Sequence, residues 1–278
     1  MVVCITVLTA PTLTHVIPSQ GRESVNAVTS LDNDVFVVRY NTHQVEVYDA
    51  KTFTLHSHIT IPGVKPWSYG IAACARNNCI YLSNAVNNRV HRIALSDGNA
   101  VKKWSVANGL RGLSVNKECN LVVACLGANK LQEYTTSGKF VREICLQAGV
   151  TDPWHAIQLS TGDYVVSQYT SSGVVSVVGV DGKVVCKYGQ SLTSDVGQMK
   201  HPSSLAVTKN DDILVADTHN NRILSINRST GCVQELSINV GLQWPNGLCL
   251  DESRGRLYVG EECGQRRVLI FDGVCATL

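Results

Sequence analysis

Aromatic, basic and amide side chains recur along the sequence where repeated apolar segments begin and in the turns that follow them. Tryptophan, tyrosine and arginine contribute much of the binding energy at protein interfaces. The same rings stack on unpaired bases, and basic side chains contact phosphates. These residue types therefore predict a recognition surface. The candidate binding residues are Asn26, Arg39, Tyr40, Trp67, Tyr69, Arg111, Lys130, Trp154, His155, Tyr169, Ser203, His219, Trp244 and Asn246.

The sequence lacks the short motifs that organise common catalytic and metal sites. It has no Cys-x-x-Cys pair for structural zinc, no Gly-x-Ser-x-Gly nucleophile elbow and no phosphate-cradling Gly-Lys-Ser loop. We therefore expect a non-catalytic protein with no catalytic residues, no bound metal and no cofactor.

Three sequence anchors recur in the same order through six units of the chain. The first anchor, a small residue followed by an apolar one, is found at Ala27-Val28, Gly70-Ile71, Gly112-Leu113, Ala156-Ile157, Ser204-Leu205 and Gly247-Leu248. An apolar run such as Ile213-Leu-Val-Ala216 follows, and then a glycine turn such as Asp181-Gly182, which the first unit lacks. Valine, isoleucine and tyrosine are abundant and turns recur about every ten residues, which indicates short strands and hairpins. Four such strands in about 44 residues are typical of one β-propeller blade.

The six units predict an all-β fold: a single-domain, six-bladed β-propeller of four-stranded antiparallel blades over residues 1–278. After Gly247 the chain has room for only three more strands, so the apolar segment from Val2 to Val16 is expected to complete the last blade. Such a clasp leaves no free sheet edge where the chain closes. The expected blades span about residues 24–66, 67–109, 110–153, 154–202, 203–245, and 246–274 together with 1–20.

Strand direction predicts which side of the propeller carries the candidate residues. In an antiparallel blade, the loop after strand two and the loop into the next blade open on the same side, here called the channel face. Loops on a rigid scaffold often carry binding residues. Strand one is innermost, so the residues entering it are expected to rim the central channel: Asn26, Tyr69, Arg111, His155, Ser203 and Asn246. Inter-blade loops add Trp67, Trp154, His201 and Trp244 to this face.

Residues His201 to Leu224 resemble an NHL repeat, and Gly189 to Pro202 resemble the linker that precedes one. Asn87-Asn88-Arg89 repeats the Asn-Arg element of that family. The tripartite-motif ubiquitin ligases end in such propellers, and the chain is similar to their C-terminal part. This resemblance implies an RNA or protein partner bound on one propeller face. No RING or B-box cysteine pattern occurs in the sequence, so ligase chemistry is not assigned to it.

Residues Trp244 to Glu261 also resemble one blade of the lactonases and strictosidine-synthase-like proteins, which are six-bladed enzymes. That resemblance would put Asn246 at a calcium-ligand position. Calcium needs six to eight oxygen ligands, usually including carboxylates. The expected channel ring has no carboxylate and includes Arg111, whose charge would repel the ion. A metal-dependent hydrolase or lyase is therefore the least favoured alternative.

Two modes of binding stay open on the channel face. In the favoured mode, a protein or peptide docks with Tyr69, Arg111 and the tryptophans as anchors. In the alternative, single-stranded or hairpin RNA binds with Arg39, Arg111 and Lys130 on phosphates, and with tyrosines or His155 on bases. The net charge of only +2 weakens the RNA alternative. The same face also carries the carboxylates Asp152, Asp217, Glu261 and Glu262.

Some of these residues have structural alternatives. Trp67, Trp154 and Trp244 each adjoin a proline, and a repeated aromatic residue can pack between blades. The pairs Asp217–Arg222 and Glu261–Arg267 are expected to form ion pairs that hold their hairpins. As surface pairs they would contribute only ~0–1 kcal/mol to stability.

Composition sets the remaining expectations. With 44% hydrophobic and 17% charged residues the chain is a globular protein, and no run approaches the ~18 apolar residues of a membrane span. We therefore expect no membrane association. Eleven cysteines, several within apolar runs, predict buried reduced thiols and a cytoplasmic, intracellular location. One disulfide, between Cys74 and Cys79 across a short turn, stays open as an alternative.

Overall fold

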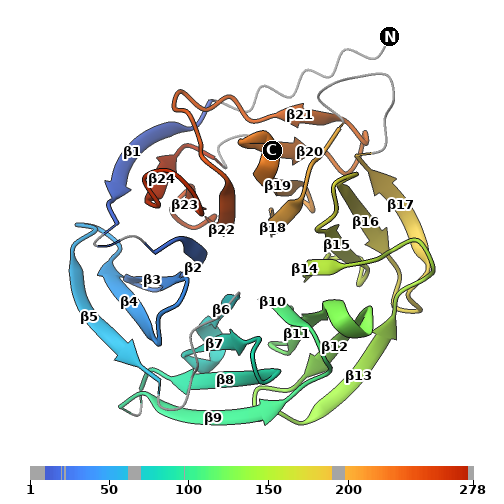
Figure 1. Ribbon diagram of the computed structural model, residues 1–278, viewed down its shortest axis with the longest axis horizontal. Helices are drawn as coiled ribbons and strands as arrows, with labels where there is room; N and C mark the ends of the chain where they lie inside the picture. The colour runs from blue at the N-terminus through green and yellow to red at the C-terminus, as the bar shows by residue number, and fades with distance from the viewer. Residues whose placement is uncertain are drawn as a thin grey trace.

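The structure, a computed structural model, describes residues 10–19, 21, 23–61, 70–96, 98–189 and 198–274. Six four-stranded antiparallel sheets are arranged as blades around a central axis (Figure 1). The predicted all-β, six-bladed propeller is confirmed. In each blade the innermost strand lies nearest the axis, and the outermost strand lies at the outer edge of the propeller (Figure 1).

The blades are numbered in chain order, and their strands run from the axis outward. Blade one consists of β2 (Val25–Leu31), β3 (Asp34–Arg39), β4 (Gln44–Asp49) and β5 (Leu55–Thr60). Blade two consists of β6 (Ile71–Cys74), β7 (Cys79–Asn84), β8 (Arg89–Ala94) and β9 (Ala100–Ser105). Blade three consists of β10 (Leu110–Val115), β11 (Leu121–Cys125), β12 (Lys130–Tyr134) and β13 (Phe140–Cys145).

Blade four consists of β14 (Pro153–Gln158), β15 (Tyr164–Gln168), β16 (Val174–Val178) and β17 (Val184–Tyr188). Blade five consists of β18 (Pro202–Val207), β19 (Ile213–Asp217), β20 (Arg222–Ile226) and β21 (Val233–Glu235). Blade six consists of β22 (Pro245–Asp251), β23 (Arg256–Glu261), β24 (Val268–Asp272) and β1 (Thr12–Ile17). Short 3₁₀ turns follow strands of these blades: η1 (Ala75–Asn77) follows β6, η2 (Leu126–Ala128) follows β11, and η4 (Thr218–Asn220) follows β19.

The first strand of the chain closes the propeller. β1 pairs antiparallel with β24, so the predicted clasp is confirmed. The strand lies in the second half of the predicted segment, and residues 1–9 are outside the described part of the chain. Ile17 is only 1% exposed and belongs to the cluster that contains Val268 and Ile270. β1 therefore contributes both hydrogen bonds and buried apolar surface.

Deletion of residues 1–20 is expected to lower the melting temperature and promote aggregation, because it uncovers the edge of β24. Thermal unfolding and size-exclusion chromatography measure the two effects. The control is Val16→Ala, which removes an exposed side chain from the same strand. A truncated protein that stays monomeric with an unchanged melting temperature would show that β1 does not hold the ring closed.

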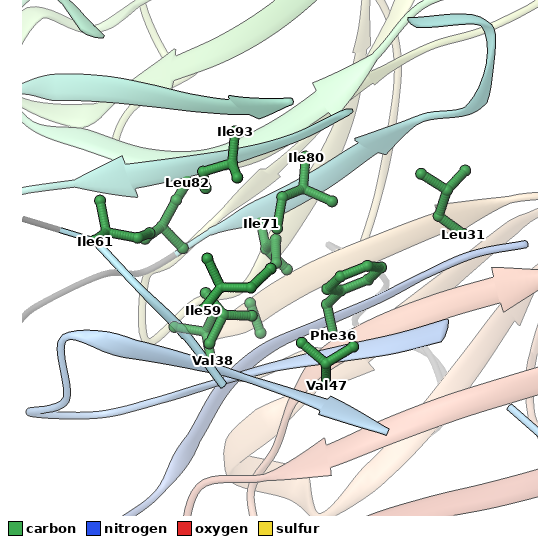
Figure 2. Packing of buried hydrophobic residues seen from close by; sticks show 12 residues of the cluster. Leu31, Phe36, Val38, Val47, Ile59, Ile61, Ile71, Ile80, Leu82 and Ile93 are labelled. Carbon is green, nitrogen blue, oxygen red and sulfur yellow. The ribbon is translucent and has the colours of Figure 1, made fainter. Parts of the chain in front are cut away.

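Apolar side chains fill the spaces between neighbouring blades. Figure 2 shows one such interface, where Val38, Val47 and Ile59 of blade one face Ile80 and Ile93 of blade two. The second strands of the blades are covered on both faces, which explains nearly continuous apolar sequences such as that of β11. The resulting ring is a rigid support for the loops at its two faces.

The repeat has a different register in blade four from the one that the sequence suggests. In blade four the first pair after the bulge in the first strand is His155 with Ser167. The equivalent pairs are Ala27 with Val38 in blade one and Gly247 with Gly260 in blade six, so His155 corresponds to Ala27 and Gly247. The first anchor of this blade is therefore His155-Ala156, not Ala156-Ile157. The pattern of a small residue followed by an apolar one fits Ala156 in either register, and only strand pairing distinguishes the two. The residue that enters this blade at the rim position is consequently Trp154.

The cysteines in the described residues are free thiols. Cys74 and Cys79 are paired across β6 and β7 and are both buried, but no disulfide joins them. Cys125 is also buried, whereas Cys145 is exposed and the other five are partly buried, so the expectation of buried thiols holds for only part of the set. Within the described ranges no helix is long and apolar enough to cross a membrane.

Candidate recognition site on the channel face

Five aromatic rings form a continuous row across blades four to six, here called the aromatic ladder: Trp154, Tyr169, His201, His219 and Trp244. Ring centroids are 4.3 Å apart between Trp154 and Tyr169, 4.7 Å between Tyr169 and His201, and 4.2 Å between His201 and His219. Trp244 completes the row, with its ring centroid 4.6 Å from that of His219. The structure thus brings together four of the predicted binding residues, joined by His201.

Each ladder residue lies at a strand end that opens on the channel face. Trp154 is the second residue of β14, Tyr169 follows β15, and His219 lies in η4. His201 and Trp244 each precede the proline that begins an inner strand, with positive φ angles of 51° and 50°. Bulky residues rarely adopt this left-handed conformation. The connections between blades therefore hold these two rings in place at a local cost in backbone energy.

Trp154 and Trp244 do not occupy matching positions in their blades. Trp154 follows Pro153, whereas Trp244 precedes Pro245 and corresponds to His201 and to Asp152, which has a φ of 51°. The expectation of one repeated tryptophan position is therefore wrong for this pair. Trp244 nevertheless packs between blades, since its ring stacks on His219 of blade five.

The ladder has polar groups at both ends. The guanidinium carbon of Arg111 lies 5.4 Å from the ring centroid of Trp154. Burial raises the pKa of Glu262, whose backbone N–H donates to the carbonyl of Trp244. Burial lowers the pKa of His219, and the neighbouring His201 and Lys200 lower it further. These causes favour the neutral form of His219 within the ladder.

His155 lies in the channel and ties three inner strands together. Its Nε2 donates to the carbonyl of Leu113 on β10 at 3.0 Å, and its Nδ1 accepts from the N–H of Leu205 on β18 at 3.0 Å. These partners fix one neutral tautomer, because a carbonyl only accepts and an N–H only donates. Burial lowers the pKa of His155 to about 4. A Cβ at Gly112 would lie 2.6 Å from the His155 ring, so the neighbouring blade needs glycine there.

The imidazole of His155 nearly fills the rim side of the channel. The cavity between it and the rim, which Asn26 and Asn246 also line, has a volume of about 30 Å³. That space holds about one water molecule. On the other side of His155 the channel widens to about 240 Å³. Among the described residues, the space at this end of the channel is therefore too small for a ligand much larger than water.

Several predicted binding residues are engaged inside the protein. Arg39 is 2% exposed, and its Nε contacts both carboxylate oxygens of Glu46 at 2.8 and 2.9 Å. Ser203 is fully buried, with its hydroxyl 2.7 Å from that of Thr218. Asn26 and Asn246 are also buried. Arg39 and Ser203 hold neighbouring strands together, and burial leaves all four residues little surface for a partner.

The remaining candidates lie away from the ladder or outside the described residues. The Lys130 ammonium is 3.0 Å from a carboxylate oxygen of Glu143. Tyr40 is exposed at the start of the loop after β3. Tyr69 and Trp67 lie outside the described residues.

The two expected ion pairs form, at 2.8 Å for Asp217–Arg222 and 2.9 Å for Glu261–Arg267. Their expected surface location is wrong, since both carboxylates are 0% exposed. Asp217 also accepts the backbone N–H of Lys200 at 2.6 Å, and Glu261 accepts that of Gln243 at 3.0 Å. Each buried carboxylate thus fastens the loop that enters its blade. The small stability contribution of an exposed ion pair is therefore not the right estimate for these two buried pairs.

Comparisons with known proteins agree with this architecture. The NHL repeat family matches residues 199–224. A search among curated proteins found no match to the sequence. A protein of unknown function from Bacteroides caccae is similar in structure, with a TM-score of 0.69, 15% identity, and coverage of 87% of this chain and 91% of that one.

Two further solved structures share the fold. A structural genomics protein of unknown function from Bacteroides thetaiotaomicron has a TM-score of 0.72 at 10% identity, covering 94% of this chain and 73% of that one. Virginiamycin B lyase from Staphylococcus aureus has a TM-score of 0.68 at 12% identity, covering 94% and 99%. At such identities the likeness concerns the fold alone. The protein is a six-bladed β-propeller that carries an NHL repeat in its fifth blade.

Proposed function

We propose that this protein is a non-catalytic recognition module that binds a protein or peptide partner on its channel face. The observation that carries the proposal is the aromatic ladder, a row of five rings held by strand ends of three adjacent blades. Aromatic residues on a rigid support are the usual anchors of protein interfaces. Arg111 and Glu262 place polar groups beside the two ends of this row. The resemblance to the propellers of tripartite-motif proteins is consistent with this role.

The contacts within the ladder favour a protein over RNA. A base stacks on an exposed ring face. Here Trp154 and Tyr169 stack on each other at an interplanar angle of 22°, and His219 and Trp244 do so at 25°. Each stacked pair therefore uses ring faces that a base would need. Trp244, at 38% exposure, still offers edge and surface to apolar side chains of a partner.

The basic residues of the RNA alternative are poorly placed for phosphates. Arg39 is buried against Glu46, and Lys130 is paired with Glu143. Arg111 lies over Trp154 and donates from Nη1 to the carbonyl of Leu110 at 2.9 Å. Phosphate binding would have to replace these interactions.

The channel residues support a non-catalytic role. His155 is held between two backbone groups and is neutral at physiological pH. The hydroxyl of Ser203 contacts Thr218 and the carbonyl of Asn246. A general acid or base needs access to a substrate and a pKa suited to proton transfer. These two side chains instead hold the inner strands together.

Partner capture with ladder variants tests the proposal. Trp244→Ala and Tyr169→Ala are expected to weaken capture of the partner at least tenfold, since each removes an interface anchor. The matched control is Val185→Ala, which truncates an exposed apolar side chain on β17 at the outer edge of blade four. Quantitative mass spectrometry after crosslinking compares the variants with the unmodified protein. Equal capture by all four proteins would contradict a role for the ladder.

A second measurement separates protein from RNA recognition. Fluorescence polarisation with a pool of short single-stranded RNAs at two salt concentrations is expected to show no tight binding. Tight binding that weakens steeply with salt would instead establish phosphate contacts, at a slope of about −0.7 per phosphate. That outcome, combined with loss of binding in Arg111→Glu, would replace the protein proposal with the RNA one.

A further inference from the structure

A groove at the outer edge of the propeller, between blades one and two, is separate from the aromatic ladder on the channel face. Its volume is about 530 Å³, which is within the range of small-molecule sites. It is bounded by β5, β8 and β9, together with Gly98 and Asn99 just before β9. The residues that shape it include Ile59, Thr60, His91, Asn99, Val101 and Lys103.

His91 brings an unmet hydrogen-bonding requirement to this groove. The residue is 2% exposed, and neither of its ring nitrogens has a hydrogen-bond partner among the described residues. Buried polar side chains are nearly always satisfied by protein, water or ligand. Ile93, two residues further along β8 and on the same face, belongs to the hydrophobic cluster between the blades that also contains Ile59 of blade one. His91 therefore points toward the space between the blades.

The charge around His91 selects the kind of ligand. Lys103 is directly opposite His91 in the pairing of β8 with β9, so both side chains lie on the same face of the blade. Burial lowers the pKa of His91, and the charges of Lys103 and Arg89 lower it further. In blade one, Glu46 is already neutralised by Arg39 at 2.8 Å. No Asp or Glu is found among the described residues that line the groove.

A ligand must meet both of these conditions. A metal cation would be repelled by Lys103, and a wholly apolar molecule would leave His91 unsatisfied. An oxyanion accepts a hydrogen bond from imidazole and pairs with an ammonium group. Ile59 and Val101 add apolar surface beside these polar groups.

We propose that the groove between blades one and two binds a small organic molecule through a phosphate or carboxylate group. Lys103 supplies the positive charge and His91 a hydrogen bond to the oxyanion. The aliphatic walls at Ile59 and Val101 contact the organic part. This site is independent of the aromatic ladder and of its partner.

The test follows the His91 ring signals by NMR during titration of the full chain with inorganic phosphate, phenyl phosphate and benzoate. A saturable shift is expected with at least one of the two aromatic anions, at lower concentration than with inorganic phosphate. The aromatic probe that binds more tightly identifies the preferred oxyanion. No saturable shift with any of the three probes would overturn the proposal.

Two charge reversals on the same strand give a matched comparison. Lys103→Glu is expected to weaken binding of the aromatic probe at least tenfold. Lys102→Glu changes the net charge equally but pairs with Arg92 on the opposite face, so it is expected to change affinity less than twofold. Both lysines are exposed, so neither substitution disturbs the core. Equal weakening by the two variants would show nonspecific attraction and would overturn the site.

Discussion

Replacing His155 with alanine is expected to lower the free energy of unfolding at pH 7 by about 3 kcal/mol. The substitution removes a ring from the narrow side of the channel, and it leaves the Leu113 carbonyl and the Leu205 N–H without their partner. Loss of buried volume and of two buried hydrogen bonds together gives an effect on the order of 3 kcal/mol. Water that enters the space and hydrogen-bonds to these two backbone groups reduces the loss of stability.

The same histidine makes stability depend on pH. Its pKa is about 4 in the folded protein, against the ordinary 6.5. Between these values the unfolded chain binds a proton that the folded protein does not, so stability falls as the pH falls from 6.5 to 4. The loss from this group approaches about 3 kcal/mol, at 1.36 kcal/mol for each unit of pKa difference. Above pH 6.5 the ring is neutral in both states and contributes no pH dependence.

Urea unfolding of the unmodified protein and of His155→Ala between pH 4 and 7.5 measures both effects. The difference between the two proteins is expected to be largest above pH 6.5 and to shrink toward zero at pH 4. His43→Ala, at an exposed position, is the control and is expected to leave stability at pH 7 unchanged. Parallel profiles for the unmodified protein and His155→Ala would show that His155 is not held neutral.

Replacing Asp217 with alanine is expected to destabilise the protein by about 3 kcal/mol or more. The carboxylate is fully buried and accepts hydrogen bonds from Arg222, Asn220 and the backbone of Lys200. Its removal takes from Arg222, which is 14% exposed, the carboxylate 2.8 Å away, and leaves the more distant carboxylate of Glu235 at 3.6 Å. Removing one member of a buried pair is strongly destabilising, and the exposed Glu235 compensates the Arg222 charge only from 3.6 Å.

The loss is also expected to reach the aromatic ladder. Lys200 precedes His201, and Asn220 follows His219, so Asp217 fastens both segments that carry the two histidine rings. Urea unfolding measures stability, and the NMR signals of the two rings report the loosening. The control is Asp181→Ala, which breaks the exposed pair with Lys183 and is expected to have little effect. Equal destabilisation by the two variants would contradict the importance of burial.

The strands of this protein were predictable because they are encoded locally. Continuous apolar runs such as Val35 to Val38 and turns such as Asp181-Gly182 lie within single hairpins. Closure by an N-terminal strand also followed, since the last unit has too few residues for four strands. Both predictions depend on residues close in sequence or on simple counting.

The register of blade four was not predictable in the same way. Ala156 fits the small-residue position in either of two registers, and the choice depends on pairing with Ser167 and Val166. The shift moves His155 from the rim into the channel. No sequence pattern shows that this ring reaches Leu113 and Leu205, which lie in two other blades.

The candidate site was partly predictable. The sequence indicated that Trp154, Tyr169, His219 and Trp244 share a face, because strand direction decides on which side each loop opens. It did not show that they touch one another. Arg39 was placed on the same face but is buried against Glu46. The groove at His91 was missed, although a histidine within the apolar pattern of β8 was a detectable signal.

By itself, the sequence determined the strands, the six blades, the clasp and the face on which the aromatic residues gather. Hydrophobic periodicity and turn residues act over a few positions, so they can be recognised without knowing the packing. Only the tertiary structure decided which polar side chains are buried, which rings stack and which histidine fills the channel. Those outcomes depend on distances between strands about fifty residues apart, which are set when neighbouring blades pack around a common axis.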